Sequence, residues 1–390
     1  MDGPQNERDV YMASRRLILV FLPLLLNAEG SFDEYKERQN KSFKQDRVKF
    51  IDYRKEEEQA FKSYRLKEQK AIAAYKEKLK AFWPEADLGN EKKLVNYSKD
   101  LHTKTVIDFK NNEVTVSQIS PAKKISEEEL VEKLNRTLSL DNKKAFKESG
   151  LEQEIDRISR ESKYVKKASL DRQPLLPLVS KKRSVKREDI TFVKKGNLYQ
   201  ARYKLPKDAT YQRSFNYLVS AKSNARRFNL QAQWLLAIMH SESSFNPMAR
   251  SWVPAYGLMQ IVPRTAGIDA YQFLYKKRRL LSASYLYNTR NNIETGSAYF
   301  HILYYKYLSS IKNPTSRLYC AIAGYNTGAG NVARAFVGTN SVKQASSVIN
   351  RMSPEEVYAH LLQNLKYDEP KHYLRRVRAR SMKYKELYRL

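Results

Sequence analysis

Glu242 is the acidic residue whose position in the sequence is easiest to connect with chemistry. No other Asp or Glu occurs between Ala209 and Ile268, and Glu242 stands at the end of an apolar helix predicted over 231–243. The negative end of a helix dipole and the loss of water beside an apolar turn both raise the pKa of a carboxyl group. A carboxyl group that keeps its proton near neutral pH can serve as the general acid in glycosidic bond cleavage. The alternative is an ordinary exposed or salt-bridged glutamate, with Arg250 or Arg264 as its partner.

Several short motifs accompany Glu242 in a fixed order. Glu242-Ser243 opens the stretch ESSFNP, GLMQ occupies 257–260 and AGYN occupies 323–326. Tyr373 lies near the C-terminal helix, and the stretch 291–299 adds Asn292, Ile293, Gly296 and Tyr299. With these motifs the chain resembles the lytic transglycosylases of the goose-type lysozyme fold, the enzymes that cut bacterial peptidoglycan. The resemblance covers 206–386 and, more faintly, 31–205.

The resemblance implies a particular reaction. The family cleaves the β-1,4 bond between N-acetylmuramic acid and N-acetylglucosamine without adding water, because the muramic 6-hydroxyl attacks its own anomeric carbon and leaves a 1,6-anhydro end. One carboxyl group suffices, first as acid and then as base, whereas most glycosidases use two. No second acid lies within 26 residues of Glu242, which agrees with such a reaction. Asp269 and Glu294 remain candidates for a partner from elsewhere in the fold.

The resemblance also assigns roles to individual residues. Glu242 is expected to be catalytic, with the Tyr325 hydroxyl beside it to help set its protonation. The expected substrate-binding residues are Ser243, Gly257, Met259, Gln260, Asn326 and Tyr373. For most of these a structural role is the alternative: a capping hydroxyl for Ser243, a core position for Met259 and Tyr373, a backbone-bonded tyrosine for Tyr325, and a structural amide for Asn326. His240 would point away from Glu242 on the same helix and is expected to be non-catalytic.

Two other functions compete with this interpretation. The first is a lysozyme-type muramidase, which would add water at the same bond. The second is a non-catalytic peptidoglycan-binding or scaffold protein with a degenerate site, which the intact motifs oppose. A nucleic-acid binder is not expected, because the basic clusters lack the interleaved aromatic residues of a single-strand platform.

Composition limits the chemistry further. The chain of 390 residues has a net charge of +30, which points to an anionic partner such as peptidoglycan strands with their acidic stem peptides. A membrane surface is a second candidate partner. The single cysteine, Cys320, cannot build a disulfide within the chain, and no metal site or cofactor is expected.

The N-terminal residues predict export. Arg15 and Arg16 precede ten apolar residues at 17–26, and a small residue, Ala28, follows. This is the pattern of a secretory signal over 1–28, and the apolar run is too short for a membrane span. Translation could start at Met1 or Met12. The protein is expected in the periplasm or cell envelope, while a lipoprotein anchor is doubtful because no Cys follows the signal.

The sequence then divides into three segments. Residues 29–84 contain only Gly30 and Pro84 as helix-breaking residues, and they predict a long charged helix with an eleven-residue aromatic repeat. The segment is either one spacer helix or two helices with a bend at 40–47. Residues 85–205 predict a small α/β domain with hairpins at 106–116 and 190–203 and a flexible basic linker at 161–188. Envelope proteins are candidate partners of 29–205.

Residues 206–390 predict an all-α catalytic domain of lysozyme-like fold. Helical spacing is expected at 217–228 and 231–243, and again at 292–308, 315–324, 328–337, 341–351, 354–365 and 370–386. No strand is expected after 206. The fold class is therefore mainly α, with long helices and a small α/β region ahead of the catalytic domain.

Overall fold

The computed structural model describes residues 29–390, apart from 122–123 and 178–184. The chain forms two units, Met1–Gln59 and Ala60–Leu390. The predicted signal at 1–28 and the basic triplet Lys181-Lys182-Arg183 lie outside the described residues. In the part of the chain that is described, no helix combines the length and apolarity needed to cross a membrane.

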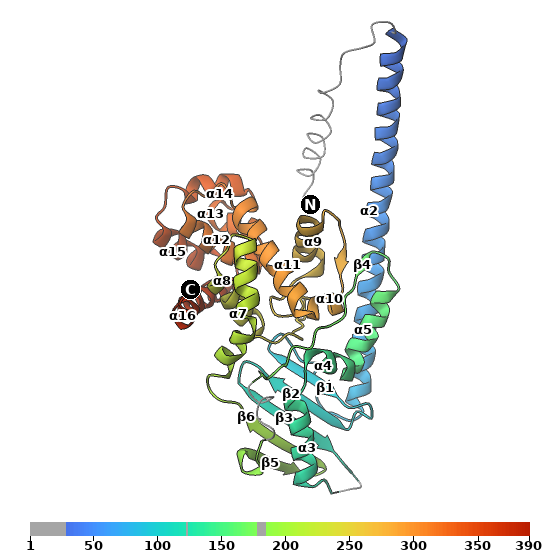
Figure 1. The fold of residues 1–390 in the computed structure, drawn as a ribbon, viewed down its shortest axis with the longest axis vertical. Coiled ribbons are helices and arrows are strands. Elements are labelled where there is room, and N and C mark those ends of the chain that lie inside the picture. The colour runs from blue at the N-terminus through green and yellow to red at the C-terminus, as the bar shows by residue number, and fades with distance from the viewer. Residues whose placement is uncertain (1–28, 122–123, 178–184) are drawn as a thin grey trace. The chain divides into compact units, whose positions relative to one another are not determined.

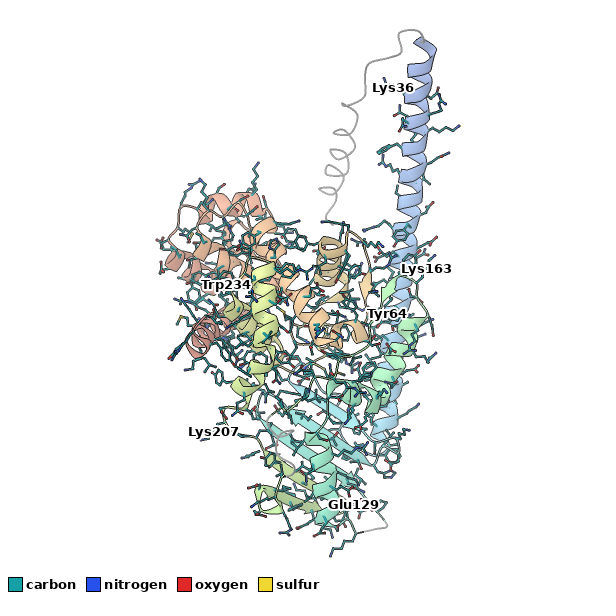
Figure 2. All side chains as sticks on the ribbon, in the orientation of Figure 1. Lys36, Tyr64, Glu129, Lys163, Lys207 and Trp234 are labelled. Atoms are coloured by element: carbon teal, nitrogen blue, oxygen red, sulfur yellow. The ribbon has the colours of Figure 1, made fainter. Side chains whose placement is uncertain are left out.

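Helix α2 (Glu29–Lys80) is continuous, so the bend considered at 40–47 is wrong. The unit boundary falls inside this helix. Beyond it, the predicted aromatic repeat becomes a packing face: Tyr64, labelled in Figure 2, packs with Ile158, Val165 and Leu280. Further along the chain, Leu79 at the end of α2 and Trp83 just beyond it pack on the sheet strand that follows.

A five-stranded antiparallel sheet follows α2, with the strand order β1-β2-β3-β6-β5 (Figure 1). Its strands are β1 (Lys93–Tyr97), β2 (Thr103–Asp108), β3 (Glu113–Ile119), β5 (Ile190–Lys195) and β6 (Leu198–Lys204). Both predicted hairpins are present, and their turns use positive φ at Asn112 (54°) and Gly196 (56°). Helix α3 (Glu127–Leu138) packs on β3 and β6, and Ser126 caps it by accepting a hydrogen bond from the Glu129 amide at 3.2 Å.

The segment between the two hairpins is more ordered than the sequence predicts. It contains α4 (Asn142–Glu148), α5 (Gly150–Arg160), the short strand β4 (Val165–Lys166) and the 3₁₀ turn Arg187–Asp189. The predicted solvated linker at 161–188 is wrong for the described residues up to 177, because Leu175 and Leu176 are buried in the main core. The sequence prediction missed these few buried leucines because most residues of the segment are polar.

The C-terminal part is a cluster of helices, as predicted. Its elements are α7 (Ala209–Arg227), α8 (Ala232–Ser243), the π-helical turn Pro263–Gly267, α9 (Ile268–Tyr275), β7 (Leu280–Leu281), α10 (Ala283–Tyr287), α11 (Thr289–Ile302), the π-helical turn Leu303–Tyr307, α12 (Pro314–Thr327), α13 (Ala329–Val337), α14 (Val342–Ile349), α15 (Pro354–Asn364) and α16 (Asp368–Tyr388). The short strand β7 was not expected. It pairs in parallel with β4.

The apolar helix α8 lies at the centre of this cluster, between α7 and α16 (Figure 1). Residues 235–239 of α8 are fully buried, and Trp234, labelled in Figure 2, contacts the rings of Phe300 and Tyr304. The same hydrophobic core continues into the sheet through Phe109 and Val114. The mainly α fold class with a small α/β region is confirmed, while the domain boundaries at 84/85 and 205/206 remain predictions.

Candidate active site

The end of helix α8 carries one carboxyl group, on a helix whose side chains are mostly buried. Ser241 and Ser243 are buried, whereas Glu242 between them is partly exposed. The helix ends because Ser244 (φ 51°) and Phe245 (φ 64°) both adopt left-handed backbone conformations, and the Ser244 amide donates to the His240 carbonyl at 3.1 Å. Two such residues in succession without glycine are uncommon and turn the chain sharply away from Glu242.

Burial raises the pKa of Glu242 to about 7. The nearby Tyr373 hydroxyl and the positive charges of Lys92 and Arg376 oppose this rise, and the Glu369 carboxylate adds to it. Loss of hydration therefore outweighs the neighbouring cations, as expected for a carboxyl group on an apolar helix. Arg250, one of the partners considered from sequence, pairs instead with Glu152 at 3.6 Å.

Tyr373 of α16 stands beside Glu242. Its side chain is buried, and its hydroxyl has no partner within 3.5 Å among the described residues, although a longer hydrogen bond to Glu242 lowers the pKa of that carboxyl group. Burial, followed by the charge of Glu242, raises the pKa of Tyr373 far above its ordinary value, so the hydroxyl keeps its proton. Because buried polar groups are normally paired, this hydroxyl is suited to a ligand oxygen or water next to the carboxyl group.

Ser243 joins the end of α8 to the loop that carries GLMQ. The side chain is fully buried, and its hydroxyl lies 2.8 Å from the Leu258 carbonyl and 3.1 Å from the Met239 carbonyl. A hydroxyl enclosed in this way has no surface for a sugar. Ser243 ties the end of α8 to the GLMQ loop, and its contact with substrate stays a prediction.

The first half of the GLMQ loop depends on a glycine. Gly257 has φ of 75°, and a Cβ atom there would lie 2.3 Å from the Asn292 amide nitrogen and 2.4 Å from the Leu286 carbonyl oxygen. Its own amide donates to the Ala249 carbonyl at 2.8 Å. Gly257 therefore shapes the loop, and it offers no side chain to a substrate.

Met259 occupies the core, the alternative considered from sequence. Its side chain is fully buried against Gly296, where an added Cβ would come within 2.5 Å of the Met259 sulfur. The Met259 amide donates to Asn292 Oδ1 at 2.8 Å, and its carbonyl accepts from the Tyr325 hydroxyl at 2.8 Å. The backbone of Met259 is thus fixed from both α11 and α12.

Gln260 and Tyr325 border the same region and are both partly exposed. Gln260 (φ 47°) donates from its side-chain amide nitrogen to the Gly257 and Ala249 carbonyls at 3.0 and 3.2 Å, while its Oε1 is buried and has no partner among the residues that the structure describes. The Tyr325 hydroxyl donates to the Met259 carbonyl and so does not donate to Glu242. Burial, and then the charge of Glu242, raises the pKa of Tyr325. Asn326, next in the chain, is also partly exposed.

His240 and the two acids named as possible partners are engaged elsewhere. The His240 Nδ1 atom lies 3.0 Å from the Tyr384 hydroxyl, and burial lowers the pKa of His240 to about 2, so the ring is neutral. Asp269 accepts a hydrogen bond from Tyr307 at 2.9 Å, and Glu294 accepts from Tyr275 at 2.9 Å and pairs with Arg227. The acid that acts on Glu242 is instead Glu369, which sequence reasoning missed.

Sequence reasoning also missed the long helix as a neighbour of this loop. Tyr256, directly before GLMQ, is buried and its hydroxyl donates to Glu68 of α2. Burial raises the pKa of Glu68, with the hydrogen bond from Tyr256 opposing it. No spacing in the sequence links positions 68 and 256, so only the fold could reveal this contact. Across the described ranges, His, Cys, Asp and Glu form no group of three or more that could hold a metal ion.

The sequence around this site matches a known family of proteins. Residues 220–348 match the family model described as the transglycosylase SLT domain, and this stretch contains Glu242, GLMQ and AGYN. This confirms the resemblance to lytic transglycosylases.

The curated relatives carry a more specific name. The chain is 39% identical over 188 residues to membrane-bound lytic murein transglycosylase C of Serratia proteamaculans, covering 48% of this chain and 52% of the relative. It is 41% identical over 174 residues to the protein of the same name from Klebsiella pneumoniae, covering 45% and 48%. The chain spans about half the length of these curated relatives. Among solved structures, lytic transglycosylase Slt of Pseudomonas aeruginosa, as an inactive mutant, matches 44% of this chain and 24% of its own at 25% identity, with a TM-score of 0.33.

Proposed function

We propose that this protein is a peptidoglycan lytic transglycosylase that uses Glu242 as its single acid and base. The observation that carries the proposal is the state of Glu242: a partly exposed carboxyl group with a pKa of about 7, at the end of a buried helix inside an SLT domain. Its substrate is the β-1,4 bond between N-acetylmuramic acid and N-acetylglucosamine. The names of the curated relatives support the same substrate.

The proposed reaction has two proton transfers. Protonated Glu242 gives its proton to the glycosidic oxygen as the bond to the anomeric carbon breaks, and the sugar leaves with that proton. The resulting carboxylate then takes the proton of the muramic 6-hydroxyl, whose oxygen closes onto the anomeric carbon. Glu242 is protonated again at the end, and no water is consumed. Lys92 and Arg376 would stabilise the carboxylate that exists between the two transfers.

Product analysis tests the reaction type. Digestion of purified peptidoglycan is expected to release muramic ends lighter by one water than reducing ends, as mass spectrometry can show. Ordinary reducing ends would contradict the proposal and indicate the muramidase alternative. Glu369, the acid whose charge raises the pKa of Glu242, is exposed and accepts a hydrogen bond from Arg376 at 2.9 Å.

The pH profile of kcat/KM should report the acid directly. The raised pKa of Glu242 means that the proton needed for the first step is present below about pH 7 and is lost above it. We therefore expect activity to fall about tenfold for each pH unit above the pKa. A basic limb near the ordinary carboxyl pKa of about 4 to 5 would contradict the assignment of Glu242. Thermal unfolding over the same pH range controls for loss of structure.

Four residues of the predicted set are proposed as contacts or neighbours of the glycan: Tyr373, Gln260, Asn326 and Tyr325. The Tyr373 hydroxyl lies next to Glu242 and has no partner within 3.5 Å in the described part of the chain, and Gln260 and Asn326 are partly exposed. We place the protein in the cell envelope, where peptidoglycan is found. Envelope proteins and a membrane surface stay candidate partners.

A further inference from the structure

The end of helix α8 is held by cations from three different parts of the chain. The last carbonyl groups of a helix lack partners within it and carry the negative end of its dipole. Here the Lys92 ammonium donates to the Ser241 carbonyl at 2.6 Å, and the Arg213 guanidinium donates to the Ser244 carbonyl at 3.3 Å. Arg380 of α16 donates to the Ser241 hydroxyl at 2.9 Å. Glu242 lies in the middle of these contacts.

Lys92 is the member of this set that comes from the α/β segment. It directly precedes β1, and its carbonyl accepts a hydrogen bond from the Phe109 amide at 2.9 Å, which fixes its backbone to the end of β2. Arg213 reaches the same corner, because its guanidinium also donates to the Phe109 carbonyl at 2.7 Å and to Asn112 at 3.0 Å. The corner of the sheet and the end of α8 are therefore joined by two charged side chains.

We propose that Lys92 is a positioning residue for Glu242, which anchors the end of helix α8 and places a positive charge beside the carboxyl group. The inference rests on the proposed function for its catalytic consequence. It gives the α/β segment a direct part in the active site, although the SLT match begins only at residue 220.

The charge of Lys92 is suited to this role. Burial lowers the pKa of Lys92 to about 8, with Glu242 opposing the fall, so the ammonium form dominates at neutral pH. The other groups that face Glu242 are Tyr373, Glu369 and Arg376 of α16 and Tyr325 of α12, while Glu91 and Arg380 act on Lys92. Among these, Tyr373, Lys92 and Arg376 lower the pKa of Glu242, and Lys92 is the larger influence of the two cations. Without Lys92 the carboxyl group would keep its proton to higher pH and would be a less stable carboxylate in the second step.

The test compares three substitutions of Lys92 in the full chain. Lys92→Gln removes the charge but keeps a donor for the Ser241 carbonyl, Lys92→Met removes both, and Lys92→Arg keeps both. Two readouts are needed: the pH profile of peptidoglycan turnover, and the titration of the Glu242 carboxyl band by infrared difference spectroscopy with Glu242→Gln as the reference. The infrared readout requires no catalysis. If the wild-type protein were inactive, the proposed function would be overturned, but the infrared titration would still test the effect of Lys92 on Glu242.

We expect Lys92→Gln and Lys92→Met to move both the basic limb and the carboxyl titration upward by about one pH unit, and Lys92→Arg to restore them. Lys93→Met is the matched control, because the neighbouring Lys93 ammonium lies 3.5 Å from Asp108 and the same charge is removed. An unshifted titration in folded Lys92→Gln, or an equal shift in Lys93→Met, would overturn the proposal. If both neutral variants fail to fold while Lys93→Met folds, Lys92 is a structural anchor only, and the proposal is again overturned.

Discussion

Replacing Glu242 with glutamine is expected to lower peptidoglycan turnover by about a thousandfold, the usual contribution of general acid and base catalysis. Glutamine has nearly the shape of the protonated side chain but can neither give nor take the proton. The change also removes no charge below about pH 7, where Glu242 is neutral. The variant should therefore fold normally, and release of soluble muropeptides from purified sacculi measures the loss.

Glu369→Gln is the control for that experiment. It removes a carboxylate that acts on Glu242 from the start of α16, and it should leave turnover within about tenfold of wild type. Because Glu369 raises the pKa of Glu242, its removal should shift the basic limb to lower pH. If Glu242→Gln retained activity, or if Glu369→Gln abolished it equally, the single-carboxyl assignment would be wrong and a two-carboxylate hydrolysis would replace it.

Most helices of the C-terminal part were predictable because their signals are local, whereas α9 and α10 were not predicted. The caps at Asn313, Ser341 and Ser353 lie immediately before helices that the spacing also predicts, and each side chain accepts a backbone hydrogen bond in the structure. The hairpin turn at Asn112 was predictable for the same reason, since Asn tolerates positive φ. Strand β1 was missed because its pattern is short, and β4 and β7 have two residues each.

The site was predictable only in part, because motifs mark positions and not exposure. The sequence identified Glu242 and Tyr373, which the structure brings together, but it treated Ser243 and Met259 as substrate contacts. Both are fully buried, because their side chains join α8, the GLMQ loop and α11. Lys92 could not be found from sequence, since its contact with Ser241 spans 149 positions.

The buried links around the GLMQ loop suggest that this loop is the part of the site most sensitive to small changes. Asn292 alone accepts from the Met259 amide and donates to the Tyr256 and Leu286 carbonyls, each at 2.8 Å. Ser243 and Tyr325 hold the Leu258 and Met259 carbonyls. A displacement of Gly257 would therefore also move the backbone of Leu258 and Met259, because the hydrogen bonds to Ser243, Asn292 and Tyr325 hold these residues in place.

We expect Gly257→Ala to lower the free energy of unfolding by about 3 kcal/mol and to remove most of the activity. Part of this cost is the left-handed backbone at φ of 75°, about 1–2 kcal/mol for a residue with a Cβ atom. The rest is overpacking, because the new methyl group would lie 2.3 Å from the Asn292 amide nitrogen and 2.4 Å from the Leu286 carbonyl oxygen. Neither atom can move without breaking the hydrogen bond between them. Denaturant unfolding and peptidoglycan turnover measure the two effects.

Gly338→Ala separates the two causes. Gly338 has φ of 71°, and an added Cβ there would meet no atom within 4 Å, so only the backbone cost applies. That variant should lose about 1 kcal/mol and keep its activity. Equal destabilisation of the two variants would mean that the crowding around Gly257 relaxes at no cost, and that the loop is not held as rigidly as its hydrogen bonds indicate. A stable but inactive Gly257→Ala protein would instead show that the loop shifts as a whole and carries the site with it.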